Sequence, residues 1–337
     1  MTSATISLAS QPENAPQLPD IACLHEFWAA HGNGGRQLQP QVERLLLDTL
    51  GIGNKQAYFA LHHARLDFDQ FRQWIVATAG LPDPVLVSRF HSWLYELPLE
   101  AEAQAELGAI DDMEPVLDDA QMRHWDEKGF VVLSDAIPAE EVAAVRNLVW
   151  TEAGGTPDHA DSWYASRDDG IMISCYQHPA LELARRSLRI RKAFAQLWGT
   201  ANLWIAIDRV GFNPPERPGY PFAGSDLHWD VSLARPIPFA TQGVMYLTDT
   251  AADQGAFRCV PGFHRRIDKW LDSLDGTPPR SVDLGDQQVT VPGKAGDLVI
   301  WRQDLPHGAS PNRAGSPRLV QYVNCYSPDL EVNPRWL

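Results

Sequence analysis

Two histidines and one aspartate have the types and the spacing of a metal-binding set. His228 and Asp230 stand two residues apart, and His307 follows the apolar run from Asp297 to Trp301. On an extended segment residues two apart share a face, so His228 and Asp230 can turn toward one ion. Two imidazoles and one carboxylate cover one face of an octahedral metal and leave the opposite face open, as a non-haem Fe(II) oxygenase needs. The pattern predicts an iron site with His228, Asp230 and His307 as ligands and catalytic residues, and with O2 as the oxidant.

Two further His-x-Asp triplets occur, and their surroundings differ. His124 and Asp126 lie in a polar segment of helical character, where residues two apart point to different sides. His159 and Asp161 lie in a polar loop punctuated by Gly and Pro, with no matching strand and second histidine after them. We expect a surface position for the first pair, and at most a place in a lid for the second.

The elements expected around the metal residues are strands joined by turns. Residues 203–212 and 297–301 are strand-like runs, and a Pro-rich loop leads from the first run to the segment that holds His228. Turn residues then reverse the chain after the second run, so residues 318–326 are predicted to return as an adjacent antiparallel strand. This arrangement would place Arg318 beside the metal, with its side chain pointing inward.

An inward arginine needs an anionic partner, because an unpaired buried charge is costly. A dicarboxylate that binds the metal at one end and the guanidinium of Arg318 at the other satisfies both groups. That partner would be 2-oxoglutarate. The residues alone leave two other interpretations open: Arg318 could pair with a local carboxylate, and His307 could be a hydrogen-bonded core residue.

Residues 116 to 330 resemble the phytanoyl-CoA dioxygenase family of Fe(II)/2-oxoglutarate oxygenases. The motifs that carry the resemblance are Lys128-Gly-Phe-Val-Val-Leu133, His228-Trp-Asp230, Cys259-Val-Pro-Gly-Phe-His-Arg265, Gly296-Asp297, Pro306-His307 and Pro317-Arg318. The resemblance implies a double-stranded β-helix, with His228, Asp230 and His307 as iron ligands and Arg318 as the partner of the distal carboxylate of 2-oxoglutarate. It also implies release of succinate and CO2, with hydroxylation of a small-molecule metabolite at a C–H bond as the default outcome.

Two positions depart from the family pattern. Phe263 stands where the family usually has a small hydroxyl residue, and residues 243–247 lack the tryptophan often found on that strand. Contacts to 2-oxoglutarate other than Arg318 are therefore not assigned. The carboxylate of Asp230 is present where related halogenases have a small residue, which disfavours halogenation.

Mixed polar and aromatic residues in loops are predicted to line the substrate pocket: Trp163, Tyr164, Arg167, Tyr176, Arg217 and Arg302. Their arginines would suit an anionic substrate, and a carrier-bound substrate is left open. Two other function classes also stay open, a cupin-like metalloenzyme that does not use 2-oxoglutarate and a non-catalytic interaction module. The complete set of His228, Asp230, His307 and Arg318 argues against both.

Composition fits a large enzyme domain with a smaller one. The chain has 337 residues, 44% of them hydrophobic, and a net charge of −15. This charge argues against nucleic acid and anionic membranes as partners. The sequence contains no run of membrane-spanning length, and its first residues lack the basic and apolar regions of a signal peptide, so we expect a cytoplasmic protein. The four cysteines lack metal-type spacing and are expected to be reduced.

Four segments are expected along the chain. Residues 1–20 predict a disordered tail, 21–97 show helical periodicity, 98–116 carry many carboxylates and predict an acidic linker or a solvated helix, and 117–337 hold the oxygenase motifs. The expected fold is mainly β with flanking helices: a double-stranded β-helix (jelly roll, cupin-like) core after a small all-α N-terminal domain. That helical domain could cover the active-site mouth, recruit a carrier-bound substrate or form a homo-oligomer interface.

Overall fold

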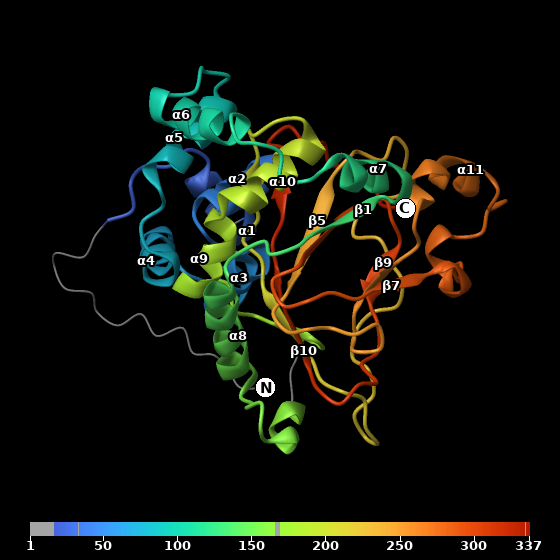
Figure 1. Ribbon diagram of the computed structural model, residues 1–337. Coiled ribbons are helices and arrows are strands. Elements are labelled where there is room, and N and C mark those ends of the chain that lie inside the picture. Colours follow the sequence, from blue (N-terminus) through green and yellow to red (C-terminus); the bar gives the residue numbers. More distant parts are fainter. Residues whose placement is uncertain (1–16, 33, 166–168, 334) are drawn as a thin grey trace. The chain divides into compact units, whose positions relative to one another are not determined.

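The computed structural model describes residues 17–32, 34–165, 169–333 and 335–337. The chain divides into two compact units, Met1–Ala109 and Ile110–Leu337, and each is described by itself (Figure 1). Most of the tail predicted for residues 1–20 lies outside the described residues, which begin at residue 17.

The first unit is built from helices. In α4 (Phe68–Ala79) the residues Phe71, Trp74 and Ile75 are buried on one face. Asp67 caps the start of this helix, because its side chain accepts a hydrogen bond from the backbone N–H three residues further on. The other elements are α1 (Leu24–Gly32), α2 (Pro40–Thr49), α3 (Asn54–Phe59), a π-helical turn (Ala60–Ala64), α5 (Pro84–Leu94) and α6 (Ala101–Asp111). Helix α6 ends just past the division between the units, within the acidic segment for which the sequence left a linker or a helix open.

A six-stranded antiparallel sheet forms the centre of the second unit. Its strands run in the order β1-β8-β5-β10-β4-β2. Strand β8 is apolar and buried along most of its length. Its β-branched and aromatic residues favour a strand that is packed on both faces. The bounds are β1 (Phe130–Leu133), β2 (Met172–Ile173), β4 (Val210–Asn213), β5 (Thr241–Tyr246), β8 (Leu298–Arg302) and β10 (Arg318–Tyr322).

The prediction that the strand after the last turn lies beside the strand over 297–301 is wrong. Strand β10 pairs with β4 and β5, and β5 separates it from β8. After β8 the chain first joins a second sheet, where β9 (His307–Ala309) pairs with β6 (Phe257–Cys259), and only then returns. Turn residues show that a chain reverses, but they do not show which sheet the next strand enters.

The second sheet has three strands in the order β7-β6-β9, with β7 over Val289–Val291. A further pair joins β3 (Trp204–Ile205) to β11 (Cys325–Tyr326). One buried cluster contains Val299 and Val320 of the six-stranded sheet together with Phe257 of β6. The two antiparallel sheets therefore share a core.

Helices cover the opposite face of the six-stranded sheet, as Figure 1 shows for α8 (Ala139–Ala153), α9 (Pro179–Arg186) and α10 (Leu188–Trp198). The strand residues of that face, Ile300 and Leu319 among them, form a second buried cluster with Phe194 of α10. The unit also contains α7 (Asp119–Lys128), α11 (Ile267–Asp272) and 3-10 turns at Ala160–Tyr164, Phe263–Arg265, Pro279–Ser281 and Gly285–Gln287.

None of the helices in the described part of the chain is long and apolar enough to cross a membrane. All four cysteines are free, and Cys175, Cys259 and Cys325 are buried. Burial raises the pKa of Cys259 to about 12, so this thiol stays protonated near neutral pH.

Candidate metal centre

A backbone bridge between two distant segments brings the two histidines together. His228 and His307 form an isolated antiparallel bridge, in which each backbone N–H donates to the other's carbonyl at 3.0 Å. His307 begins β9, whereas His228 lies outside the named strands and Asp230 follows at a bend. The extended segment that the sequence predicts here is thus reduced to one bridge. The bridge nevertheless holds the two imidazole rings with centroids 4.8 Å apart.

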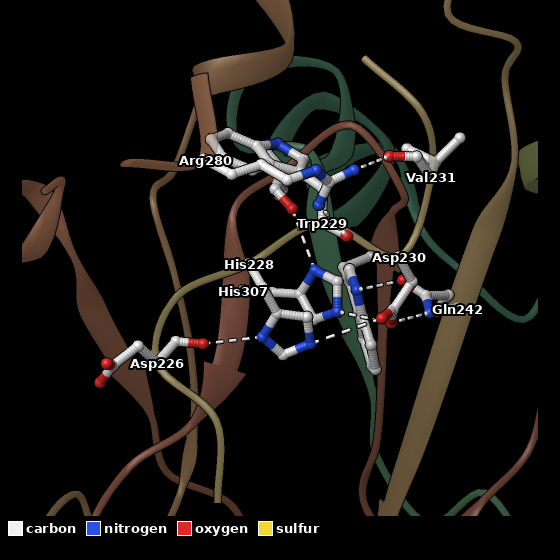
Figure 2. Close-up of polar contacts among 10 residues, drawn as sticks. Asp226, His228, Trp229, Asp230, Val231, Gln242, Arg280 and His307 are labelled. Carbon is white, nitrogen blue, oxygen red and sulfur yellow. Dashed lines mark hydrogen bonds and ion pairs between the residues drawn. The ribbon is translucent and has the colours of Figure 1, made fainter. Parts of the chain in front are cut away.

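The three predicted ligands converge on one point. One ligand atom each from His228, Asp230 and His307 lies within 4.8 Å of the other two. Nε2 of His228 is 3.5 Å from one carboxylate oxygen of Asp230, and Nε2 of His307 is 3.2 Å from the other (Figure 2). Ligand atoms about 2.1 Å from one ion and at right angles to each other lie about 3 Å apart. The donor set therefore fits a divalent transition metal.

Both imidazoles present the nitrogen that a metal needs. Nδ1 of His228 is 2.7 Å from the backbone carbonyl of Asp226, and Nδ1 of His307 is 3.0 Å from the carbonyl of Leu305. Because a carbonyl oxygen only accepts, each Nδ1 carries the proton in the neutral ring, and the lone pair is left on Nε2. Burial and the neighbouring His307 lower the pKa of His228 below its ordinary value of 6.5, which favours this neutral form.

The carboxylate of Asp230 is held in its ionised form. Desolvation raises its pKa, but the hydrogen bond and charge that His307 supplies when its Nε2 also carries a proton, a hydrogen bond from Gln242 and the charge of a protonated His228 together bring the pKa below the usual 3.8. The Gln242 amide donates to Oδ2 at 2.7 Å. The side chain of Asp230 is 52% exposed whereas that of His307 is 5% exposed. The site is therefore anchored on the buried histidine and can be reached from solvent on the aspartate side.

An arginine clamps the backbone on both sides of Asp230. Arg280 donates from Nη1 to the carbonyl of Trp229 at 2.7 Å and from Nη2 to the carbonyl of Val231 at 2.6 Å (Figure 2). The indole of Trp229 is buried and donates to the carbonyl of Asp304. These contacts fix the bend that carries the carboxylate.

Arg318 is a buried cation with free donors. It begins β10 opposite Asn213 of β4 and is only 1% exposed. Its guanidinium donates a hydrogen bond to the hydroxyl of Tyr322, but Nε and Nη2 have no hydrogen-bond partner among the described residues. Two unsatisfied N–H-bearing nitrogens on a buried cation fit a carboxylate, which a guanidinium binds through two parallel hydrogen bonds.

A sequence comparison identifies the family. The model of the phytanoyl-CoA dioxygenase (PhyH) family matches residues 125–320, more than half of the 337 residues. The chain belongs to the phytanoyl-CoA dioxygenase family. This confirms the resemblance carried by the motifs and indicates an oxidoreductase of the non-haem iron, 2-oxoglutarate-dependent dioxygenase class.

Individual relatives of this family member are distant. A Dictyostelium discoideum protein that carries the phytanoyl-CoA dioxygenase name is 28% identical over 99 residues, which is 27% of this chain and only 28% of that protein. Ectoine dioxygenase of Bordetella parapertussis is 26% identical over 237 residues, 64% of this chain and 77% of that protein.

The solved structures that resemble this chain are also distant in sequence. EctD from S. alaskensis in its apoform has a TM-score of 0.47 at 18% identity, covering 66% of this chain and 84% of that one. SnoK, a non-heme alpha ketoglutarate dependent carbocyclase from nogalamycin biosynthesis, has a TM-score of 0.45 at 22% identity, covering 67% and 88%. The family assignment rests on the sequence match and not on these likenesses.

Two of the predicted pocket residues form one cluster in this phytanoyl-CoA dioxygenase family member. The guanidinium of Arg217 lies 3.4 Å from the ring centroid of Tyr164 and 3.0 Å from the carboxylate of Asp161. Tyr164 also meets Tyr220 edge-on at 5.0 Å between centroids. Asp161, of the third His-x-Asp triplet, is therefore a counter-ion of Arg217, and His159 beside it is exposed.

The other predicted pocket residues are more buried. Trp163 and Tyr176 are 8% and 6% exposed. Arg302 makes two hydrogen bonds to the carboxylate of Asp304, at 3.0 and 2.8 Å, so its charge is already paired. Arg167 lies outside the described residues. A role of these residues in substrate binding stays a prediction. His124 and Asp126 are exposed on α7, where the sequence expects them.

Sequence reasoning missed Gln242 and Arg280. Gln242 is the one residue of β5 that is not fully buried, and an amide side chain within a run of mostly apolar residues is a signal that could have singled it out. Arg280 lies in a 3-10 turn 51 residues from the carbonyl of Trp229 that it binds. No local pattern at this position could have revealed that contact.

Proposed function

We propose that this protein is an Fe(II)/2-oxoglutarate-dependent dioxygenase that hydroxylates a small-molecule metabolite at a C–H bond. The overall reaction would consume substrate, 2-oxoglutarate and O2 and give hydroxylated substrate, succinate and CO2. The observation that carries the proposal is the combination of two histidines and one carboxylate around one point with a buried guanidinium that has two free donors. Family membership supports the same class.

In this proposal His228, Asp230 and His307 are the iron ligands, and Arg318 binds the distal carboxylate of 2-oxoglutarate. Bound iron would supply the activation of O2. The chain itself supplies two oriented imidazoles, an ionised carboxylate and a buried guanidinium, each in place before any ligand binds. Such preorganisation lowers the cost of ordering groups on binding.

The two antiparallel sheets on a shared core also support the finer assignment of the fold. In a double-stranded β-helix, consecutive strands alternate between two facing sheets. Here the chain passes from β8 in the six-stranded sheet to β9 in the three-stranded sheet and back to β10. We therefore assign Ile110–Leu337 as a double-stranded β-helix with flanking helices, and the helices before it as a separate N-terminal domain.

The substrate class is inferred from chemistry and from relatives. One relative is by its name an ectoine dioxygenase, so it acts on a small molecule. The half-exposed carboxylate of Asp230 leaves the metal reachable from solvent, as a diffusible substrate requires. Arg217 beside Tyr164 would suit an anionic group on the substrate or on its carrier that replaces the exposed carboxylate of Asp161.

Anaerobic titration with Fe(II) and 2-oxoglutarate tests the proposal directly. Wild-type protein should develop the weak visible charge-transfer band of a 2-oxo acid chelated to Fe(II), and Arg318→Ala should weaken it. Bound iron without a band would favour a cupin-like metalloenzyme that does not use 2-oxoglutarate. Failure to bind iron at all would favour a non-catalytic interaction module.

A further inference from the structure

Two hydrogen bonds lead from Trp301 through Gln242 to the carboxylate of Asp230. Trp301 of β8 and Gln242 of β5 are direct cross-strand neighbours in the six-stranded sheet. The indole N–H of Trp301 donates to Oε1 of Gln242 at 3.1 Å, and Nε2 of Gln242 donates to Oδ2 of Asp230 at 2.7 Å (Figure 2). The bend that carries the carboxylate is thereby tied to the centre of the main sheet.

The chemistry of the two ends leaves the amide of Gln242 only one orientation. An indole N–H can only donate, so it requires the amide oxygen on its side. An ionised carboxylate can only accept, so it requires the amide nitrogen on the other side. An amide without such neighbours could be turned over at little cost. Here a turned amide would lose both hydrogen bonds and would place its oxygen against the carboxylate of Asp230.

Metal binding makes the contact from Gln242 more important. The Nε2 atoms of His228 and His307 now lie 3.5 and 3.2 Å from the carboxylate oxygens. In the metal-free protein, a histidine that also carries a proton on Nε2 can donate to Asp230. Once both Nε2 lone pairs point at an ion, neither histidine can. Gln242 is then the side chain, among those described, that still orients the carboxylate. As a neutral donor it leaves the full negative charge of the carboxylate available to the ion.

Trp301 also packs against one of the histidine ligands. Its ring lies 5.1 Å from the ring of His307 and 4.5 Å from the ring of Phe257, between centroids. One buried side chain thus packs against one ligand and controls the donor that orients another. A Phe substitution at Trp301 would remove the N–H and keep an aromatic ring at this position, with the loss of the volume of the second ring of the indole.

We propose that Gln242 is a positioning residue for the carboxylate ligand, and that Trp301 sets the polarity of its amide. This inference rests on the proposed function, because it assumes that Asp230 binds a metal. Side chains that hydrogen-bond to metal ligands typically contribute about 10- to 100-fold to the affinity for the metal. Gln242→Met, which keeps the length and flexibility of the side chain but has no donor, should weaken metal binding by a factor in that range.

The test measures Co(II) binding by calorimetry, with Co(II) as an air-stable substitute for Fe(II), and records the visible d–d spectrum of the loaded protein. Gln242→Met should bind Co(II) about 10- to 100-fold more weakly and shift the spectrum. Gln321→Met is the matched control, because Gln321 is a fully buried glutamine on β10 whose amide donates to the carbonyl of Leu181 instead. That control should lose thermal stability without changing Co(II) affinity or the spectrum.

A double-mutant cycle tests the part played by Trp301. Trp301→Phe should weaken Co(II) binding. It should cause no further loss of affinity in the Gln242→Met background, because both substitutions break the same chain of two hydrogen bonds to Asp230. Additive losses would overturn the role of Trp301. If Gln242→Met does not fold, Gln242→Asn gives the same test, since its shorter amide cannot reach both partners.

The outcomes separate this inference from the proposed function. Wild-type protein that binds no Co(II) would overturn the metal centre, and the inference with it. Wild-type protein that binds Co(II) while Gln242→Met and Gln242→Asn bind it equally well, with unchanged spectra, would overturn the inference alone.

Discussion

Replacing Arg318 by methionine should have opposite effects on cosubstrate binding and on stability. Methionine keeps most of the length of the arginine side chain and removes the charge and all donors. In the complex, the distal carboxylate of 2-oxoglutarate would lose a guanidinium that is 1% exposed and has two free nitrogens. Without 2-oxoglutarate, the same substitution removes an incompletely satisfied buried cation. The first change weakens binding, and the second stabilises the fold.

The magnitudes follow from the burial and the hydrogen bonds. Truncating one partner of a buried charge pair costs about 2 to 5 kcal/mol, or about 30- to 4,000-fold in Kd at about 1.4 kcal/mol per factor of ten. An unsatisfied buried group costs about 1 to 3 kcal/mol, and loss of the hydrogen bond from Arg318 to Tyr322 offsets about 1 kcal/mol of that gain. A net gain of up to about 2 kcal/mol should raise Tm by up to about 4 to 8 °C.

Calorimetric titration of 2-oxoglutarate into the Co(II)-loaded protein measures the first effect, and thermal unfolding of the metal-free protein measures the second. Pyruvate is the control ligand, because it has the same 2-oxo acid head and no distal carboxylate. Its affinity should be the same for wild type and Arg318→Met. Equal 2-oxoglutarate affinity in both proteins would refute the role of Arg318, and a fall in Tm of several degrees would refute the reasoning from an unsatisfied charge.

Three further predictions concern the segment around Asp230. Asp230→Ala should abolish iron-dependent succinate formation, and turnover at the wild-type rate would rule out this ligand. The lowered pKa of Asp230 contributes stability that is fully present above its ordinary value of 3.8 and is lost as the pH falls toward the lower folded-state value. As the pH is lowered through the acid range, the Tm should therefore fall less steeply for Asp230→Asn than for wild type. Parallel curves of Tm against pH would contradict this. Arg280→Ala removes the clamp on the carbonyls of Trp229 and Val231 and should weaken Co(II) binding several-fold while leaving the pyruvate-to-2-oxoglutarate affinity ratio unchanged. A changed ratio would show that Arg280 acts on the cosubstrate instead.

Local patterns predict the residues that meet at the site better than the contacts that hold them there. The alternation rule put His228 and Asp230 on one side, and the motif order added His307 from 77 residues further along the chain. The sequence predicted an inward Arg318 from a strand pairing that is wrong, but the structure still buries Arg318 at the start of β10. These inferences needed only residue type, spacing and the resemblance to a family.

The supporting contacts depend on the tertiary fold. Gln242 and Arg280 reach the segment of Asp230 from 12 and about 50 residues away, and each binds an atom whose position only the folded backbone defines. The same limit explains the error about β10. The turn before it was visible in the sequence, but its neighbours β4 and β5 are chosen by the packing of the two sheets.

In the proposed site, charge balance connects Asp230 with Arg318. Asp230 is held ionised and Arg318 is a buried cation, so together they carry no net charge. A divalent metal brings two positive charges, and the 2-oxoglutarate dianion brings two negative ones. Either ligand alone would leave a net charge of two in a partly desolvated site, whereas both together leave none. In the proposed complex each would be the counter-ion of the other, and by linkage each would raise the affinity of the protein for the other by the same factor.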